Sequence, residues 1–139
     1  MNSRFVVHRH KTGRSHFDLR MVENGILRSW SLLRPPPQKR GERRLAIERE
    51  SFSPEAMTSK GFMESAFGPG KVHIWDDGEV EIEANTDKLL SLVFRGKKLL
   101  GRYELGRMRW YPGNHWILKK TDDSSAQVSD ETSKQKPVK

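Results

Sequence analysis

The chain has 139 residues, the length of one ordinary domain, and contains no cysteine, which excludes disulfide bonds, thiolate metal sites and cysteine nucleophiles. Its formal net charge of +8 and pI near 10 favour a polyanionic partner. The sequence shows neither a signal peptide nor the roughly 20 apolar residues of a membrane-spanning helix, so we expect a soluble cytoplasmic protein with no membrane partner.

The first predicted elements are three β-strands. Residues 4–8 (RFVVH) are rich in β-branched and aromatic side chains, which favour strands. Residues 16–23 (HFDLRMVE) alternate between polar and apolar side chains, which is typical of a strand with one buried face. Asn24-Gly25 follows and predicts a tight hairpin turn into residues 26–33 (ILRSWSLL), because both turn residues tolerate positive φ.

The fourth predicted strand leads into a segment of different character. Residues 43–50 (RRLAIERE) alternate again, with Leu45 and Ile47 on one side. Ser53-Pro54-Glu55 then predicts the start of a helix, because serine is a good N-cap and proline suits the first helical position. Glycines soon after this point predict that the helix is short.

Two further hairpins and a last strand are predicted beyond this segment. Residues 71–83 predict a hairpin with Asp77-Gly78 in its turn, and residues 88–108 predict another. Residues 115–120 (HWILKK) predict the last strand. Many short strands at this spacing indicate an all-β fold, a compact antiparallel β-barrel with short helical segments.

The C-terminal end differs in composition from the rest of the chain. Residues 121–139 hold three lysines and four acidic residues and almost no large apolar side chain, so we expect a disordered polar tail. We therefore expect one β-barrel domain over residues 1–120, and this part alone carries a charge of +9.

The second predicted strand carries a cluster of polar groups on one face. His16, Asp18 and Arg20 stand at alternate positions, and a short loop brings His8 and His10 of the first strand alongside them. Two imidazoles and a carboxylate suit a divalent ion of the Mn or Zn kind, and a neighbouring guanidinium suits a phosphate group. A surface network of the same residues would have the same spacing, and the pattern alone leaves both interpretations open.

The order of motifs resembles a known family. His10, the run HFDLR at 16–20 and the hairpin GILRSW at 25–30 are similar to the signature of the phosphoesterase domain of bacterial DNA ligase D and its stand-alone relatives. The resemblance extends from about residue 5 to residue 120. It implies a β-barrel and a Mn²⁺-dependent enzyme that removes 3′-phosphates from DNA and resects a terminal 3′-ribonucleotide.

The resemblance also implies a role for individual residues. His10 and Asp18 match metal ligands, and His16 matches a residue that lies on the scissile phosphate as general acid or transition-state donor. Arg20 and Arg44 match catalytic residues that bind phosphate oxygens, and Glu50 matches an acidic residue of the active site. Arg34 stands where the family commonly has a lysine and is a further phosphate-binding candidate.

The chain departs from the family pattern at Phe52, where the family has a histidine as its third protein metal ligand. A phenyl ring cannot bind a metal ion, so Mn²⁺ binding is in doubt unless His8 or His73 supplies an imidazole instead. Two functions therefore stay open: a 3′-end-healing enzyme, or a catalytically silent module that binds DNA ends or a repair partner. A more distant third is a module that binds RNA or a phosphorylated metabolite.

The resemblance further implies partners and a location. DNA 3′ ends, either of a primer on its template or of a broken duplex, are the expected substrate. A DNA ligase or a Ku-like protein is the expected protein partner, and the prokaryotic cytoplasm near the nucleoid is the expected location. We expect a monomer, because a small basic domain needs no second subunit to complete its core.

Overall fold

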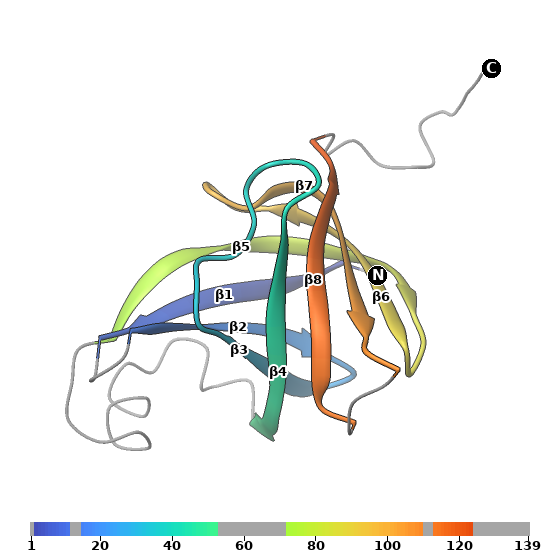
Figure 1. The fold of residues 1–139 in the computed structure, drawn as a ribbon, viewed down its shortest axis with the longest axis horizontal. Helices are drawn as coiled ribbons and strands as arrows, with labels where there is room; N and C mark the ends of the chain where they lie inside the picture. The colour runs from blue at the N-terminus through green and yellow to red at the C-terminus, as the bar shows by residue number, and fades with distance from the viewer. Residues whose placement is uncertain (1, 12–14, 53–71, 110–112, 124–139) are drawn as a thin grey trace.

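The structure, a computed structural model, describes residues 2–11, 15–52, 72–109 and 113–123. Eight strands run through these ranges: β1 Asn2–His10, β2 His16–Glu23, β3 Ile26–Leu32, β4 Arg43–Phe52, β5 Val72–Asn85, β6 Leu89–Arg95, β7 Leu100–Arg107 and β8 His115–Asp122. They close into an antiparallel barrel in the order β1-β2-β3-β4-β8-β7-β6-β5 (Figure 1). The predicted all-β barrel is confirmed, while the predicted helix at Ser53-Pro54-Glu55 lies outside the described residues.

The N-terminal hairpin forms as its turn residues predict. Asn24 and Gly25 have φ angles of 53° and 80°, the left-handed region that asparagine and glycine tolerate best. Residues at equal distances along the chain from this turn pair with each other, so β2 and β3 align from Glu23 opposite Ile26 to Phe17 opposite Leu32. Neighbouring strands thus have a fixed register in this part of the barrel, which decides which side chains meet.

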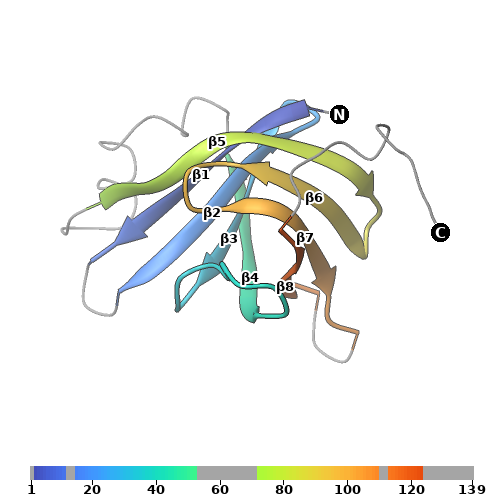
Figure 2. The ribbon, with the colours of Figure 1, turned by 90° about the horizontal axis from the view of Figure 1, so that it is seen from above.

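The barrel interior holds one apolar core. The alternate residues Phe17, Leu19 and Met21 of β2 face it, as predicted. Aromatic rings meet edge to face there, with the centroids of Trp30 on β3 and Trp116 on β8 5.9 Å apart. In Figure 2 the strands wrap around this interior, with β5 and β6 on one side and β4 and β8 on another. Within the described ranges, no helix is long and apolar enough to cross a membrane.

The alternation of β4 is confirmed, and its core-facing residue is a small one. Leu45 and Ile47 share a face, but it is the outer face, and Leu45 is 47% exposed. Ala46 points into the core instead and is fully buried. A small side chain suits this position because Trp30 and Trp116 fill the adjacent space.

The predicted hairpin at Asp77-Gly78 is wrong, because β5 runs through this turn signal as one 14-residue strand. The strand has a partner on each side: Gly78 lies opposite Phe5 within the ladder to β1, and the ladder to β6 begins at the next residue, Glu79. Glycine is required here for close approach, since an added Cβ would lie 2.5 Å from the Arg95 carbonyl oxygen of β6.

The other C-terminal elements are close to those predicted. β6 and β7 pair as a hairpin, from Arg95 opposite Leu100 to Leu89 opposite Gly106. β8 begins at His115 and continues to Asp122, two residues into the segment that composition marks as tail. Residues 124–139 lie outside the described ranges, so the division into domain and tail stays a prediction.

Candidate metal centre

Strand pairing brings the predicted polar cluster together on the outer face of β1 and β2. His10 lies opposite His16, and His8 lies opposite Asp18. On the other side of β2, Asp18 lies opposite Ser31 of β3. Directly opposed residues of antiparallel strands project to the same face, so these side chains share one surface, while the alternate residues of each strand fill the core.

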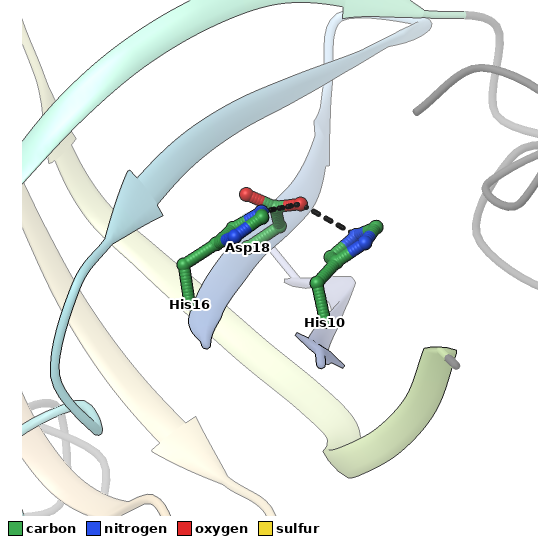
Figure 3. Close-up of side chains that lie close together, drawn as sticks. All are labelled: His10, His16 and Asp18. Carbon is green, nitrogen blue, oxygen red and sulfur yellow. Dashed lines mark ion pairs between the residues drawn. The ribbon is translucent and has the colours of Figure 1, made fainter. Parts of the chain in front are cut away.

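Two imidazoles approach one carboxylate oxygen in this cluster. The Nε2 atom of His10 lies 2.9 Å from Oδ2 of Asp18, and Nε2 of His16 lies 3.6 Å from the same oxygen (Figure 3). The two rings stack with centroids 4.6 Å apart and planes inclined by 5°. One donor atom from each of the three residues lies within 4.8 Å of the other two, and we call these residues the donor group.

The second oxygen of Asp18 is held from β3. The Ser31 hydroxyl donates a hydrogen bond of 2.6 Å to Oδ1, and Nε of Arg49 donates one of 3.1 Å to the same hydroxyl. A guanidinium nitrogen of Arg20 lies 3.7 Å from Oδ2. The carboxylate is therefore fixed in orientation by three neighbouring strands, with one oxygen directed at the imidazoles.

Burial and charge set the protonation state of this carboxylate. Asp18 is 2% exposed and Arg20 is 1% exposed. Burial by itself raises the pKa of Asp18, but contacts with His10, His16 and Ser31 and the charge of Arg20 outweigh it and lower the pKa. Burial lowers the pKa of Arg20, and the charge of Asp18 opposes that shift. Asp18 is therefore a carboxylate at neutral pH, the form that binds cations.

The donor group fits a divalent transition-metal ion. Imidazole nitrogen and carboxylate oxygen together are ligands that Mn²⁺ and Zn²⁺ accept, and the three donor atoms are close enough to share one ion. Ser31 is the kind of outer partner that orients a ligating carboxylate. His16, assigned to the phosphate by the resemblance, lies among these donors alongside the two expected metal ligands.

The two alternative imidazoles are not in the donor group. His8 is fully buried and lies opposite Asp18, yet it is not part of the group that the described residues form. His73 lies opposite Arg9 on β5, one position out of phase with His10, and is exposed. Replacement of the family's third ligand by His8 or His73 therefore stays a prediction.

Phe52 is the last residue of β4, and its side chain is outside the described part of the structure. Its backbone lies opposite Leu27, which in turn lies opposite Val22. Asp18 is four residues back along β2 from Val22. The register thus puts the backbone of residue 52 beyond Arg20 in the sheet, away from the end where His10 and His16 lie.

The structure places Arg34, Arg44 and Glu50 outside the donor group. Arg34 follows β3, and Arg44 stands at the start of β4, at the end of the sheet where His10 and His16 also lie. The Arg44 guanidinium donates to the backbone carbonyls of Pro35 and Arg43, at 2.7 and 2.8 Å. Glu50 is exposed near the other end of β4. Their functional roles stay predictions.

Sequence reasoning missed Ser31 and Arg49. Equal counting from the Asn24-Gly25 turn pairs Asp18 with Ser31, so the hairpin signal was sufficient to find the serine. No such signal exists for Arg49, because a ten-residue connection separates β3 from β4 and leaves their register unspecified.

Comparison with known proteins agrees with this geometry. Residues 8–107 match the family model described as the DNA Ligase D 3′-phosphoesterase domain. The chain is 32% identical over 119 residues to the multifunctional non-homologous end joining DNA repair protein LigD of Mycobacterium tuberculosis, which covers 81% of this chain. It is 29% identical over 134 residues to the LigD proteins of Mycolicibacterium smegmatis and Pseudomonas aeruginosa, covering 88% and 91% of this chain.

The relatives are much longer proteins. The matched regions cover 17% of the Mycolicibacterium protein, 15% of the Mycobacterium protein and 16% of the Pseudomonas protein. The similarity therefore concerns one domain of each relative. Because the family model covers most of the barrel and the relatives match nearly the whole chain, this chain belongs to the DNA ligase D 3′-phosphoesterase domain family.

Proposed function

We propose that this protein is a Mn²⁺-dependent phosphoesterase that heals DNA 3′ ends by removing a 3′-phosphate or a 3′-ribonucleotide. The observation that carries the proposal is the donor group, in which His10, His16 and Asp18 lie within 4.8 Å of one another beside a buried arginine. Membership of the family supports a role in 3′-end processing during DNA repair.

His10 and Asp18 are the residues that would hold the ion, with His16 close enough to assist either the ion or the phosphate. A bound divalent ion supplies Lewis-acid stabilisation of the charge that develops on the phosphoryl oxygens. Arg20 holds the phosphate by its guanidinium, which pairs well with phosphate oxygens. In the proposed site Arg34 and Arg44 add positive charge from the same end of the sheet, and Glu50 is the remaining acidic candidate.

The proposed reaction is hydrolysis of a phosphate monoester. Water attacks phosphorus, the bond from phosphorus to the sugar O3′ breaks, and O3′ takes up a proton to become a hydroxyl. The products are a 3′-hydroxyl end and inorganic phosphate. His16 is the proposed proton donor, because its ring is 27% exposed and so accessible from solvent, whereas that of His10 is 1% exposed.

A catalytically silent DNA-end binder is the second candidate. Phe52 favours it, because a phenyl ring stands at the position of the family's third ligand and loss of one ligand usually weakens metal binding strongly. In that case the barrel and the positive charge of +8 persist and the domain holds a DNA end or a repair partner.

A Mn²⁺ titration on a primer–template with a 3′-phosphate tests the proposed function. We expect metal-dependent release of phosphate by the wild-type protein, and a loss of about 100-fold or more in His10→Ala, since it removes a ligand at the centre of the group. His115→Ala is the matched control, because it removes a histidine of β8 that is not in the donor group. No release at any Mn²⁺ concentration, with DNA still bound, would establish the second candidate.

The partners and location follow from the same proposal. The substrate is a DNA 3′ end, and a DNA ligase or a Ku-like protein is the proposed repair partner. We place the protein in the prokaryotic cytoplasm near the nucleoid and propose that it acts as a monomer.

A further inference from the structure

A basic pocket lies at the end of β1 that also carries His10. It has a volume of about 230 Å³ and lies at the edge between β1, β5 and the β6–β7 turn. Its lining residues are Arg9, Lys11, His73, Ile74, Trp75 and Lys98, and we call it the β1–β5 pocket. Arg9 and Lys11 flank His10 along the chain, so one strand end serves both the pocket and the donor group.

Among the described residues, no ion pair neutralises the cations of the β1–β5 pocket. Within the described ranges, no carboxylate lies in ion-pair distance of Arg9, Lys11 or Lys98, and no acidic residue is among the lining residues. Nε of Arg9 is buried and has no hydrogen-bond partner. Three unpaired cations around one concavity repel each other, and an anion in the pocket would relieve that repulsion.

The position of Lys98 is built into the fold. Asp76, which is 4% exposed, accepts hydrogen bonds from the backbone N–H groups of Lys97, Lys98 and Leu99 at 2.9, 3.0 and 2.8 Å. Gly96 makes this possible, because an added Cβ would overlap the Asp76 carboxylate. Asp76, which directly precedes the Asp77-Gly78 signal in β5, thus fixes the turn between β6 and β7.

Lys98 closes one side of the pocket over an aromatic ring. Its Nζ donates a 2.9 Å hydrogen bond to the Trp75 carbonyl and lies 4.7 Å from the centroid of the Trp75 ring. Trp75 in turn meets Phe17 edge to face at 5.7 Å. Ile74 is 42% exposed beside it. The pocket therefore combines fixed positive charge with exposed apolar surface.

We propose that the β1–β5 pocket binds one single-stranded nucleotide of the DNA substrate, with its phosphate at Arg9, Lys11 and Lys98 and its base or sugar against Ile74 and Trp75. Charge together with aromatic surface is the combination that single-stranded nucleic acid recognises. The volume of about 230 Å³ is below the roughly 300 Å³ of small-ligand pockets, so the pocket takes no more than one nucleotide unit and is too small for a duplex. This inference rests on the proposed function in naming DNA as the ligand.

The test is fluorescence anisotropy in metal-free buffer with labelled primer–template that carries a single-stranded extension. Lys98→Gln removes a pocket cation, and Lys97→Gln is the matched control, because it changes the same charge in the same turn outside the lining. We expect Lys98→Gln to raise Kd about three- to tenfold and to reduce the salt slope by roughly 0.7, the value of one single-strand phosphate contact. We expect Lys97→Gln to stay within about twofold of wild type. Arg9→Gln should behave like Lys98→Gln.

A blunt duplex completes the experiment. On this probe we expect Lys98→Gln and Lys97→Gln to have equal effects, because no single-stranded nucleotide is present. Equal effects on the extended substrate, or no binding of it by the wild type, would overturn the inference. If the wild type releases phosphate but Lys98→Gln binds the extended DNA as well as the wild type does, the inference fails and the proposed function holds. If binding of the extended DNA depends on Lys98 but no phosphate is released, the inference holds and the proposed function fails.

Discussion

At the residue scale, the arrangement around Asp18 explains how a buried carboxylate stays charged. A hydroxyl, two imidazoles and a guanidinium surround it, and together they overcome the cost of burial. The pKa of Asp18 in the folded protein is therefore below its ordinary value of 3.8. Its contribution to stability is present above pH 3.8 and is lost as the pH falls through the folded pKa.

Ser31→Ala tests this arrangement. The substitution removes the 2.6 Å hydrogen bond to Oδ1 of Asp18, and we expect the free energy of unfolding at pH 7 to fall by about 1–2 kcal/mol. The loss should persist at pH 3 and shrink only as the pH falls through the lowered folded pKa of Asp18, because a protonated Asp18 no longer gains from that charge-assisted bond. Urea unfolding at pH 7 and along an acid series measures it. Ser91→Ala, a partly buried serine on β6, is the control, and an equal loss there would contradict the prediction.

The residue scale also shows what the sequence could predict of the site. His10, His16, Asp18 and Arg20 came from alternation and from the family signature, because both depend on local spacing. The contacts that orient Asp18 were not predicted. Arg49 contacts the Ser31 hydroxyl, which in turn binds Asp18, and this contact depends on the pairing of β3 with β4. Burial of the cluster was likewise not predicted, because alternation alone suggests an exposed polar face.

At the element scale, β5 shows how tertiary pairing overrides a local turn signal. Asp-Gly is typical of a hairpin turn, yet Gly78 lies inside a strand that pairs with β1 on one side and β6 on the other. The preference for a turn is weaker than the two ladders of backbone hydrogen bonds that the strand gains. Asp76, two residues before Gly78, accepts backbone hydrogen bonds from the adjacent turn between β6 and β7.

Gly78→Ala tests the close contact of β5 with β6. A Cβ would meet the Arg95 backbone oxygen at 2.5 Å, so we expect the free energy of unfolding to fall by about 1–3 kcal/mol. Gly106→Ala is the matched control, because its nearest contact is a Leu89 methyl carbon at 3.8 Å. We expect that substitution to be neutral or slightly stabilising, as it lowers the entropy of the unfolded chain. Thermal melts followed by circular dichroism compare the two, and similar shifts would contradict the prediction.

At the scale of the whole molecule, closure of the barrel joins segments far apart in sequence. β4 pairs with β8, and a network across this seam links Arg28 of β3, Glu48 of β4 and Trp116 of β8. The all-β class was predictable from periodicity. The number of strands was not predictable, because the segments before and after Asp77-Gly78 form one strand, β5, where two were predicted. The strand order was not, because pairing of β4 with β8 depends on the shape of the whole sheet.

Metal binding should stabilise the whole barrel. A ligand that binds only the folded state adds about 2.7 kcal/mol at a concentration of 100 times its Kd. We expect Mn²⁺ to raise the Tm of the wild type and of His115→Ala, and not that of His10→Ala. Mg²⁺ should give a smaller shift, because it prefers oxygen ligands over imidazole. A Tm that is insensitive to Mn²⁺ in the wild type would contradict a metal site and favour the silent binder.

The two faces of β1 serve different sites, and this makes the strand sensitive to insertions and deletions. Its alternate residues serve different surfaces: His8 and His10 stand beside Asp18, and Arg9 belongs to the β1–β5 pocket. Because the side-chain period of a strand is two, deletion or insertion of a single residue within β1 would exchange the two sets. Imidazoles would then enter the basic pocket and a guanidinium would enter the donor group. β1 can therefore tolerate single substitutions but no change in its length. Insertion or deletion of one residue there would abolish both surfaces together.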